Sequence, residues 1–283
     1  THLTFLFRDR AGIISAGSSI KVNGEDDLVK TYSILKHRSH CLVATIVGAR
    51  DLVSFEGGKI MIQVTGLTQY FKERKVLDNI HLTIEKNEKC ALVGSNGAGK
   101  STLIHSILGL IPYKEGSVKL AGFNNQTEKW KGKVSYLPEK FQLYPHLTCW
   151  ENMLFFASMT GKNPNEANMG EHLGYVRLWE SKDEQVKNFS KGMLQRLGIA
   201  IMLYYDSDIL ILDEPTSGLD PLGRIEILSI LKGLHDKTVL FSSHHLDEIK
   251  QTCSHIAFLD NGKISKYLVK DFNEQHLLGG RLA

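Results

Sequence analysis

The chain has 283 residues, of which 42% are hydrophobic and 23% are charged, and its formal net charge is +3 at pH 7. This length fits one large α/β domain with an addition, or two small domains, and the composition is that of an ordinary globular protein. The small net charge does not indicate nucleic-acid binding. The four cysteines show neither metal-ligand spacing nor a disulfide pattern, which favours a reducing compartment.

The first sixty residues do not fit the pattern of the rest of the chain. Thr1 stands where a methionine usually begins a protein, so we expect a processed chain or a fragment, and residues 61–64 resemble a natural beginning. Residues 1–6 are similar to residues 254–259. Two interpretations stay open: residues 1–60 are the tail of a preceding reading frame similar to the rest of this chain, or they are an ordinary accessory extension.

From residue 61 onward, short apolar runs alternate with helical stretches. The runs predict strands at 62–64, 81–84, 89–93, 117–120, 133–136, 208–212, 238–241 and 255–259. Helical patterns occupy 101–110, 150–159 and 195–204. Residues of about 138–187 carry no strong strand run, which predicts a helical insertion. The alternation predicts an α/β fold with a mainly parallel sheet and helices on both faces. No apolar run approaches the roughly 18 residues of a membrane span.

The glycine-rich segment G-S-N-G-A-G-K-S at 94–101 has the spacing of a P-loop. Main-chain N–H groups can surround a phosphate only where side chains do not block the approach, which explains the glycines. Lys100 is expected to reach the β- and γ-phosphates of ATP, and Ser101 to offer a hydroxyl to Mg²⁺. The loop joins a strand to a helix N-terminus, whose dipole favours phosphate. The candidate ATP-binding residues here are Gly94, Ser95, Asn96, Gly97, Ala98, Gly99, Lys100, Ser101 and Thr102.

Asp213 and Glu214 directly follow the apolar run at 208–212. A carboxylate at the C-terminal end of a parallel strand lies beside the nucleotide crevice of an α/β sheet. Asp213 is therefore the candidate Mg²⁺ ligand, and Glu214 the candidate catalytic group that polarises the attacking water. Taken alone, the acidic pair fits a solvated turn equally well. Together with the P-loop it favours a nucleotide hydrolase.

Two further segments carry a resemblance to the ABC-type ATPases. The segment N-F-S-K-G-M-L-Q-R at 188–196 resembles their signature motif, usually L-S-G-G-Q, and departs from it at Phe189, Lys191 and Met193. The segment L-D-E-P-T-S-G-L-D-P at 212–221 resembles their Walker B motif and D-loop. The resemblance covers residues 61 to about 264. It implies a P-loop NTPase core with an antiparallel β part near its N-terminus and a helical insertion that ends at the signature motif.

Carried over by matching positions, the resemblance implies a head-to-tail dimer of ATP-binding subunits. Ser190 and Gly192 of one subunit would contact the γ-phosphate held by Lys100 of the other, and Asp220 would couple the two sites. His244 would be the catalytic switch histidine that detects the γ-phosphate. Without the family, a loop histidine after the strand at 238–241 would be the simpler interpretation.

The resemblance also assigns an aromatic side chain and a carboxylate. Tyr70 or Phe71 would stack on adenine, and both stay candidates, although spacing slightly favours Phe71. Glu139 stands where the family has the Q-loop glutamine, which helps to place the metal and contacts the membrane partner. Glutamate can still offer an oxygen to a metal ion, but it adds charge and loses the amide donor. Ser101, Asp213 and Glu139 are therefore the candidate metal ligands.

The implied function is an ATP-hydrolysing subunit that powers a membrane transporter, with ATP and Mg²⁺ as cofactors. Its partners would be an integral membrane permease and a second ATP-binding subunit, alike or different, at the cytoplasmic face of the membrane. The variant signature motif, Leu137-Pro138-Glu139 and residues 144–148 resemble those of exporters of drugs, bacteriocins and ions. On this resemblance, residues 1–60 would be the tail of a preceding ATPase. The alternatives are a soluble relative acting on ribosomes or DNA, and a degenerate regulatory subunit.

Overall fold

The computed structural model describes residues 7–9, 12–14, 60–243 and 245–272. The chain divides into two units, residues 1–33 and 34–283. In the first unit, β1 (Phe7–Asp9) pairs with β2 (Gly12–Ile14) in an antiparallel hairpin. The expected likeness of residues 1–6 to 254–259 falls on residues outside the described ranges, so it stays a prediction. Everything that bears on the candidate site lies in the second unit.

A six-stranded sheet forms the centre of the second unit, with the strand order β12-β11-β5-β10-β9-β8. All neighbours are parallel except β11 and β12, which form an antiparallel hairpin at one edge. The strands are β5 (Lys89–Val93), β8 (Val134–Leu137), β9 (Ile209–Leu212), β10 (Thr238–Ser242), β11 (His255–Asp260) and β12 (Lys263–Leu268). Because β8, β9 and β10 are buried along their whole length, they are mostly apolar and contain no charged residue. The predicted mainly parallel sheet is confirmed.

A second sheet of four strands, all antiparallel, has the order β4-β3-β6-β7. Its strands are β3 (Ile60–Phe71), β4 (Arg74–Glu85), β6 (Glu115–Leu120) and β7 (Phe123–Asn124). This confirms the antiparallel part expected near the start of the ATPase domain. β3 and β4 have 12 residues each, far longer than the apolar runs at 62–64 and 81–84, because exposed residues interrupt their buried face.

Helices cover the central sheet on both faces, as the alternation predicts. They are α1 (Lys100–Ile107), α2 (Cys149–Ser158), α3 (Glu166–Tyr175), α4 (Lys191–Tyr204), α5 (Pro221–Gly233) and α6 (Leu246–Thr252), with short 3₁₀ turns at Trp179–Ser181, Val186–Asn188 and Val269–Asp271. Side chains alternate along each strand, so Ile209 and Ile211 of β9 join one core and Leu210 and Leu212 the other. The first core contains α1 and the antiparallel sheet, and the second contains α2 to α6.

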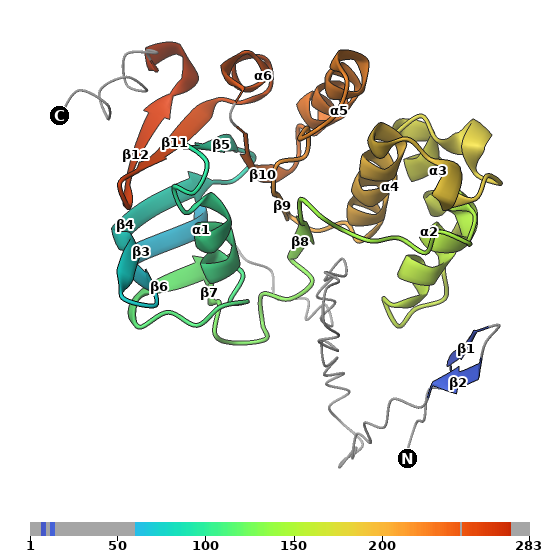
Figure 1. Ribbon diagram of the computed structural model, residues 1–283, viewed down its shortest axis with the longest axis horizontal. Coiled ribbons are helices and arrows are strands. Elements are labelled where there is room, and N and C mark those ends of the chain that lie inside the picture. Colours follow the sequence, from blue (N-terminus) through green and yellow to red (C-terminus); the bar gives the residue numbers. More distant parts are fainter. Residues whose placement is uncertain (1–6, 10–11, 15–59, 244, 273–283) are drawn as a thin grey trace. The chain divides into compact units, whose positions relative to one another are not determined.

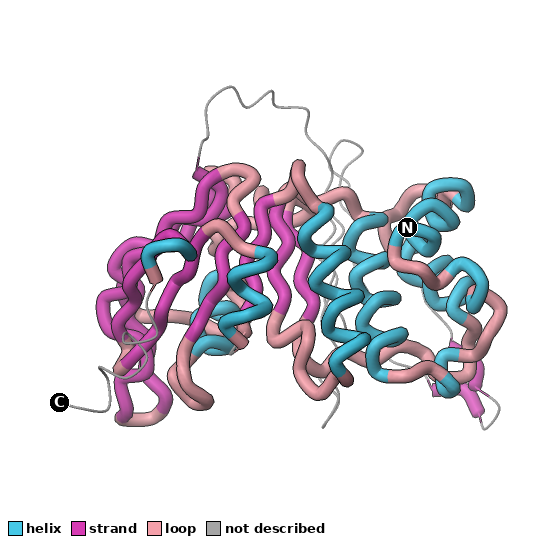
Figure 2. Tube along the Cα trace, turned by 90° about the horizontal axis from the view of Figure 1, so that it is seen from above, coloured by secondary structure: helices cyan, strands magenta, loops and turns pink. Residues whose placement is uncertain are grey.

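The predicted helical insertion is present as α2, α3 and the turns that follow them. Figure 1 shows these helices grouped with α4, apart from the antiparallel sheet, and Figure 2 shows the strands gathered toward the opposite end of the unit. Thr148 begins α2 with a capping box, in which its side chain accepts from the Glu151 N–H and the Glu151 carboxylate accepts from the Thr148 N–H. Within the described ranges, no helix combines the length and the apolar character that a membrane crossing requires.

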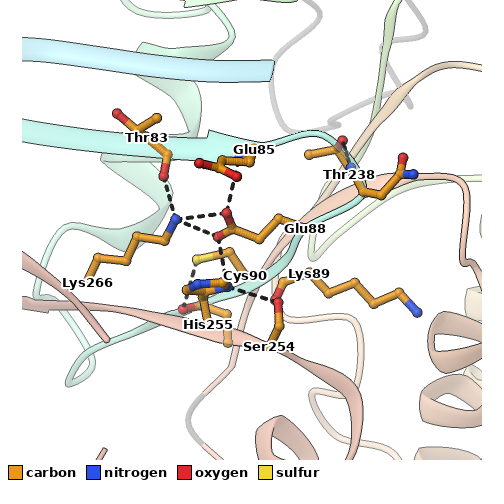
Figure 3. Close-up of polar contacts among 11 residues, drawn as sticks. Thr83, Glu85, Glu88, Lys89, Cys90, Thr238, Ser254, His255 and Lys266 are labelled. Carbon is orange, nitrogen blue, oxygen red and sulfur yellow. Dashed lines mark hydrogen bonds and ion pairs between the residues drawn. The ribbon is translucent and has the colours of Figure 1, made fainter. Parts of the chain in front are cut away.

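A buried ion-pair cluster joins the two sheets beside the start of β5 (Figure 3). The side chain of Glu88 is only 5% exposed, and the Lys266 ammonium of β12 lies 2.7 Å from Oε1 and 2.9 Å from Oε2. Lys266 also donates to the carbonyl oxygen of Thr83 in β4, and His255 Nδ1 lies 3.4 Å from Glu88 Oε1. Burial raises the pKa of the neighbouring Cys90 thiol to about 12, so this group stays protonated. Because the P-loop follows the other end of β5, the cluster serves packing rather than the candidate site.

Candidate functional site

The predicted phosphate-binding loop connects β5 to α1, as the sequence indicates. Gly99 is the N-cap of α1 with φ 105°, and a Cβ added there would lie 2.9 Å from Val76 Cγ1, so only glycine fits. A Cβ added to Gly94 would lie 2.5 Å from the carbonyl oxygen of Leu259. The Lys100 ammonium donates to the carbonyl oxygen of Gly94 at 2.9 Å, which closes the loop. The start of a helix leaves its first N–H groups without partners inside the helix, as an anion site requires.

The loop borders a cavity of about 560 Å³. Its lining combines the candidate loop residues with others far away in the sequence: Phe71, Arg74, Val76, Asn96, Gly97, Gly99, Lys100, Ser101, Thr102, Glu139, Glu214 and Ser217. Ser95 and Ala98 line a smaller cavity of about 260 Å³ that shares Asn96 and Gly97 with the first. The fold therefore brings the phosphate loop, Glu139 and Glu214 to one place.

The two candidate aromatic residues are placed differently. Phe71 lines the larger cavity and is 71% exposed, so its ring is available to a ligand. Tyr70 precedes it in the strand and is absent from the described lining of both cavities; the Lys75 ammonium lies 5.9 Å from the centre of its ring. Neighbouring residues of a strand point to opposite faces, which explains the difference. The geometry favours Phe71 of the two candidates.

The acidic pair lies at the C-terminal end of β9, next to β10. Asp213 is buried, and its Oδ1 accepts a hydrogen bond of 2.7 Å from the Ser242 hydroxyl. The backbone N–H of Glu214 donates to the same Ser242 oxygen, also at 2.7 Å. Glu214 has φ 47°, an uncommon left-handed conformation for this residue type. Glu214 Oε1 lies 3.3 Å from the Lys100 ammonium, so the catalytic candidates at the start of α1 and after β9 form an ion pair.

The candidate metal ligands offer oxygen atoms only, the donor type that Mg²⁺ prefers. Ser101 and Glu139 line the cavity directly, and Asp213 precedes Glu214, which lines it too. In the described part of the chain, no three His, Cys, Asp or Glu side chains form a group able to hold a metal ion. Mg²⁺ usually takes one or two protein ligands and completes its shell with phosphate oxygens and water.

Ser190, Gly192 and Asp220 are absent from the described lining of the cavity, whereas Ser217, earlier in the D-loop segment, belongs to that lining. Ser190 is the N-cap of α4, where its hydroxyl accepts from the Met193 N–H at 3.2 Å. Asp220 is the N-cap of α5 and accepts from the Gly223 N–H at 3.1 Å. A Cβ on Gly192 would be 3.8 Å from Gly223 Cα, so the two motifs are neighbours within the subunit. His244, the candidate switch histidine, lies outside the described residues.

Two residues that no motif in the sequence marks organise this region. Ser242 bridges the acidic pair, as described above. Glu248 of α6 is buried, and its Oε2 accepts from the hydroxyl groups of Thr216 at 2.8 Å and Ser243 at 3.2 Å. These bonds connect the loop after β9 with the loop after β10. The only local signal was the pair of serines before His244.

Comparisons with known proteins agree with this geometry. The family model described as ABC transporter matches residues 77–217. The lantibiotic transport ATP-binding protein SrtF of Streptococcus pyogenes is 35% identical over 231 residues, which cover 78% of this chain and all of that protein. The linearmycin resistance ATP-binding protein LnrL of Bacillus subtilis is 35% identical over 210 residues, covering 72% of this chain and 68% of that protein.

The chain belongs to the ABC transporter family, as an ATP-binding subunit. A solved structure of an ATP-binding subunit of an ABC transporter superposes with a TM-score of 0.66 at 29% identity, covering 79% of this chain and 95% of that one. As an ABC subunit of this kind, the protein is an ATPase that binds ATP and drives transport together with membrane components. The resemblance read from residues 188–196 and 212–221 is confirmed.

Proposed function

We propose that the protein is the ATP-hydrolysing subunit of an exporter. It docks on an integral membrane permease at the cytoplasmic face of the membrane and acts together with a second ATP-binding subunit. The observation that carries the proposal is the single cavity in which the phosphate loop, Glu139 and Glu214 meet. The export direction is supported by the variant signature motif and by relatives named for linearmycin resistance and lantibiotic transport.

Binding begins at the phosphate loop. Backbone N–H groups of residues 96–102 and the N-terminus of α1 receive the phosphates, and Lys100 supplies the charge. Lys100 is paired with Glu214, so an arriving phosphate displaces the Glu214 carboxylate from the Lys100 ammonium. Phe71 stacks on the adenine ring, and Tyr70 is the second candidate for that contact.

Ser101, Asp213 and Glu139 are the residues that would hold Mg²⁺ beside the phosphates. When bound, the ion neutralises charge on the phosphate oxygens. The buried Ser242 donates to Oδ1 of Asp213, so that carboxylate has a fixed orientation.

Hydrolysis requires a water molecule in line with the γ-phosphate. The water oxygen bonds to the γ-phosphorus while the bond from that phosphorus to the β–γ bridging oxygen breaks, and Glu214 receives the proton. Ser190 and Gly192 of the second subunit complete the site from outside. Asp220 couples the two sites, and His244 contacts the γ-phosphate. In the monomer, Ser190 and Gly192 lie apart from the described lining of the cavity, which fits a contribution to the other subunit's site.

We further propose that the ATPase domain comprises residues 61–283, with a helical subdomain at about 138–187, and that residues 1–60 are appended to it. The alternative of a soluble ABC ATPase on ribosomes or DNA is not favoured, because the relatives compared above carry the names of transport and resistance proteins.

The test is ATP binding and hydrolysis by the purified full chain with Mg²⁺. We expect hydrolysis by the unmodified chain, and weakened nucleotide binding in Lys100→Ala because the ammonium that meets the phosphates is lost. Lys162→Ala, which removes an exposed lysine between α2 and α3, is the matched control and should behave as the unmodified chain. Unchanged ATP affinity in Lys100→Ala would contradict the assignment of the phosphate loop.

A further inference from the structure

Ser242 occupies a central place at the catalytic edge of the sheet. It is the last residue of β10, which lies between β5 and β9, the strands that lead to the phosphate loop and to the acidic pair. In the parallel register Ser242 pairs with Leu92 of β5, and the preceding Phe241 pairs with Leu212 of β9. The side chain is fully buried, so bulk solvent does not reach its hydroxyl group.

One hydroxyl group makes two short hydrogen bonds to the acidic pair. It donates to Asp213 Oδ1 and accepts from the backbone N–H of Glu214, both at 2.7 Å. Only a side chain that is donor and acceptor at the same atom can make both bonds. The bonds have different consequences: the first fixes the rotation of the Asp213 carboxylate, and the second fixes the peptide group of Glu214.

The second bond matters because of the backbone conformation of Glu214. Its φ of 47° is left-handed, a conformation that a non-glycine residue keeps only when its surroundings hold it there. The buried Ser242 oxygen is the acceptor for the N–H of that residue. The conformation in turn sets the direction of the Glu214 side chain, which lines the cavity and meets Lys100.

The neighbouring serine shows that this arrangement is specific. Ser243 is equally buried, but its hydroxyl donates to Glu248 and accepts from the backbone N–H of His245. Of the two serines at the end of β10, Ser242 is the one bonded to the acidic pair.

We propose that Ser242 is a positioning residue for hydrolysis, which orients the Asp213 carboxylate toward the metal ion and the Glu214 carboxylate toward the attacking water. This inference rests on the proposed function of the acidic pair. Ser242 is absent from the described lining of the cavity, so it acts through the acidic pair. Its loss therefore lowers kcat and raises the Mg²⁺ concentration needed for half-maximal activity, while ATP binding without metal is unchanged because Lys100 and the loop N–H groups are untouched.

The test compares Ser242→Ala and Ser242→Cys with the unmodified full chain. Both variants lose the strong hydroxyl bonds, and cysteine keeps nearly the same volume. We expect kcat to fall about 10- to 100-fold, the range that a displacement of about 1 Å causes in a reacting group. ATP affinity measured in EDTA should equal that of the unmodified chain. Ser135→Ala is the matched control, since Ser135 of β8 is also buried and bonds to Ser207, which lies in the loop before β9.

A second measurement separates positioning from a general loss of stability. If Ser242 acts through Glu214, its removal should lower kcat by a much smaller factor in a Glu214→Gln chain than in the unmodified chain. The reason is that the effects of two residues that act as a unit do not add. An equal fractional loss of kcat in the unmodified and the Glu214→Gln chains would overturn the inference. The same holds if both Ser242 variants keep the kcat and the Mg²⁺ dependence of the unmodified chain. Absence of hydrolysis in the unmodified chain would instead overturn the proposed function, and this inference with it.

Discussion

Replacement of Glu214 by glutamine should separate ATP binding from ATP hydrolysis. The substitution keeps the size and shape of the side chain but removes the negative charge that receives a proton from water. General base catalysis contributes about 10²- to 10⁴-fold, so the barrier should rise by about 3–5 kcal/mol. Because Glu214 Oε1 lies 3.3 Å from the Lys100 ammonium, the substitution also removes a group that competes with phosphate. ATP affinity should therefore be equal or higher.

Phosphate release and equilibrium nucleotide binding, measured on the same preparations, test this pair of effects. Glu180→Gln is the control, since Glu180 is exposed on the helical subdomain and should behave as the unmodified chain. Unmodified turnover in Glu214→Gln would remove Glu214 from its catalytic role. A loss of ATP affinity as large as the loss of turnover would refute the competition between Glu214 and phosphate.

Two further predictions concern the cavity and the buried ion pair. Phe71→Ala should weaken ATP binding by about 1 kcal/mol through lost stacking, whereas Tyr70→Ala should change the Kd little; the reverse order would assign adenine to Tyr70. Lys266→Met leaves the buried Glu88 without its ammonium and should lower the free energy of unfolding by about 3 kcal/mol, or Tm by roughly 10 °C. Lys263→Met removes only a surface ion pair with Asp78 and should leave the melting curve nearly unchanged; equal melting curves for the two variants would contradict the role of burial.

The parts of the fold that the sequence predicts well are those whose signal is local. The strand β9 is apolar at every position because both of its faces are covered. The glycines of the P-loop are required because Gly99 packs against Val76 and Gly94 against Leu259. The sequence did not predict α5, because Leu222 and Ile225 on its first turns are 65% and 62% exposed. Exposed apolar residues weaken the helical period of the hydrophobic pattern. The sequence also did not predict the edge strand β12, because most of its residues are exposed and it has no continuous apolar run.

The parts of the candidate site that the sequence could not predict depend on distant residues. Ser242 meets Glu214 across 28 positions of the chain and Glu248 meets Thr216 across 32, so no local pattern marks either contact. The choice between Tyr70 and Phe71 depends on which face of β3 borders the cavity, and that is set by the pairing of whole strands. Residue types and spacing indicate the chemistry, and the sheet register places the supporting residues.

Co-purification of the tagged chain from gently solubilised native membranes tests the transporter function most directly. We expect a polytopic membrane protein in stable complex with the chain, because an ATP-binding subunit of this family drives transport through membrane components. Recovery of ribosomal or purely soluble partners, with no membrane protein among them, would contradict the proposed function.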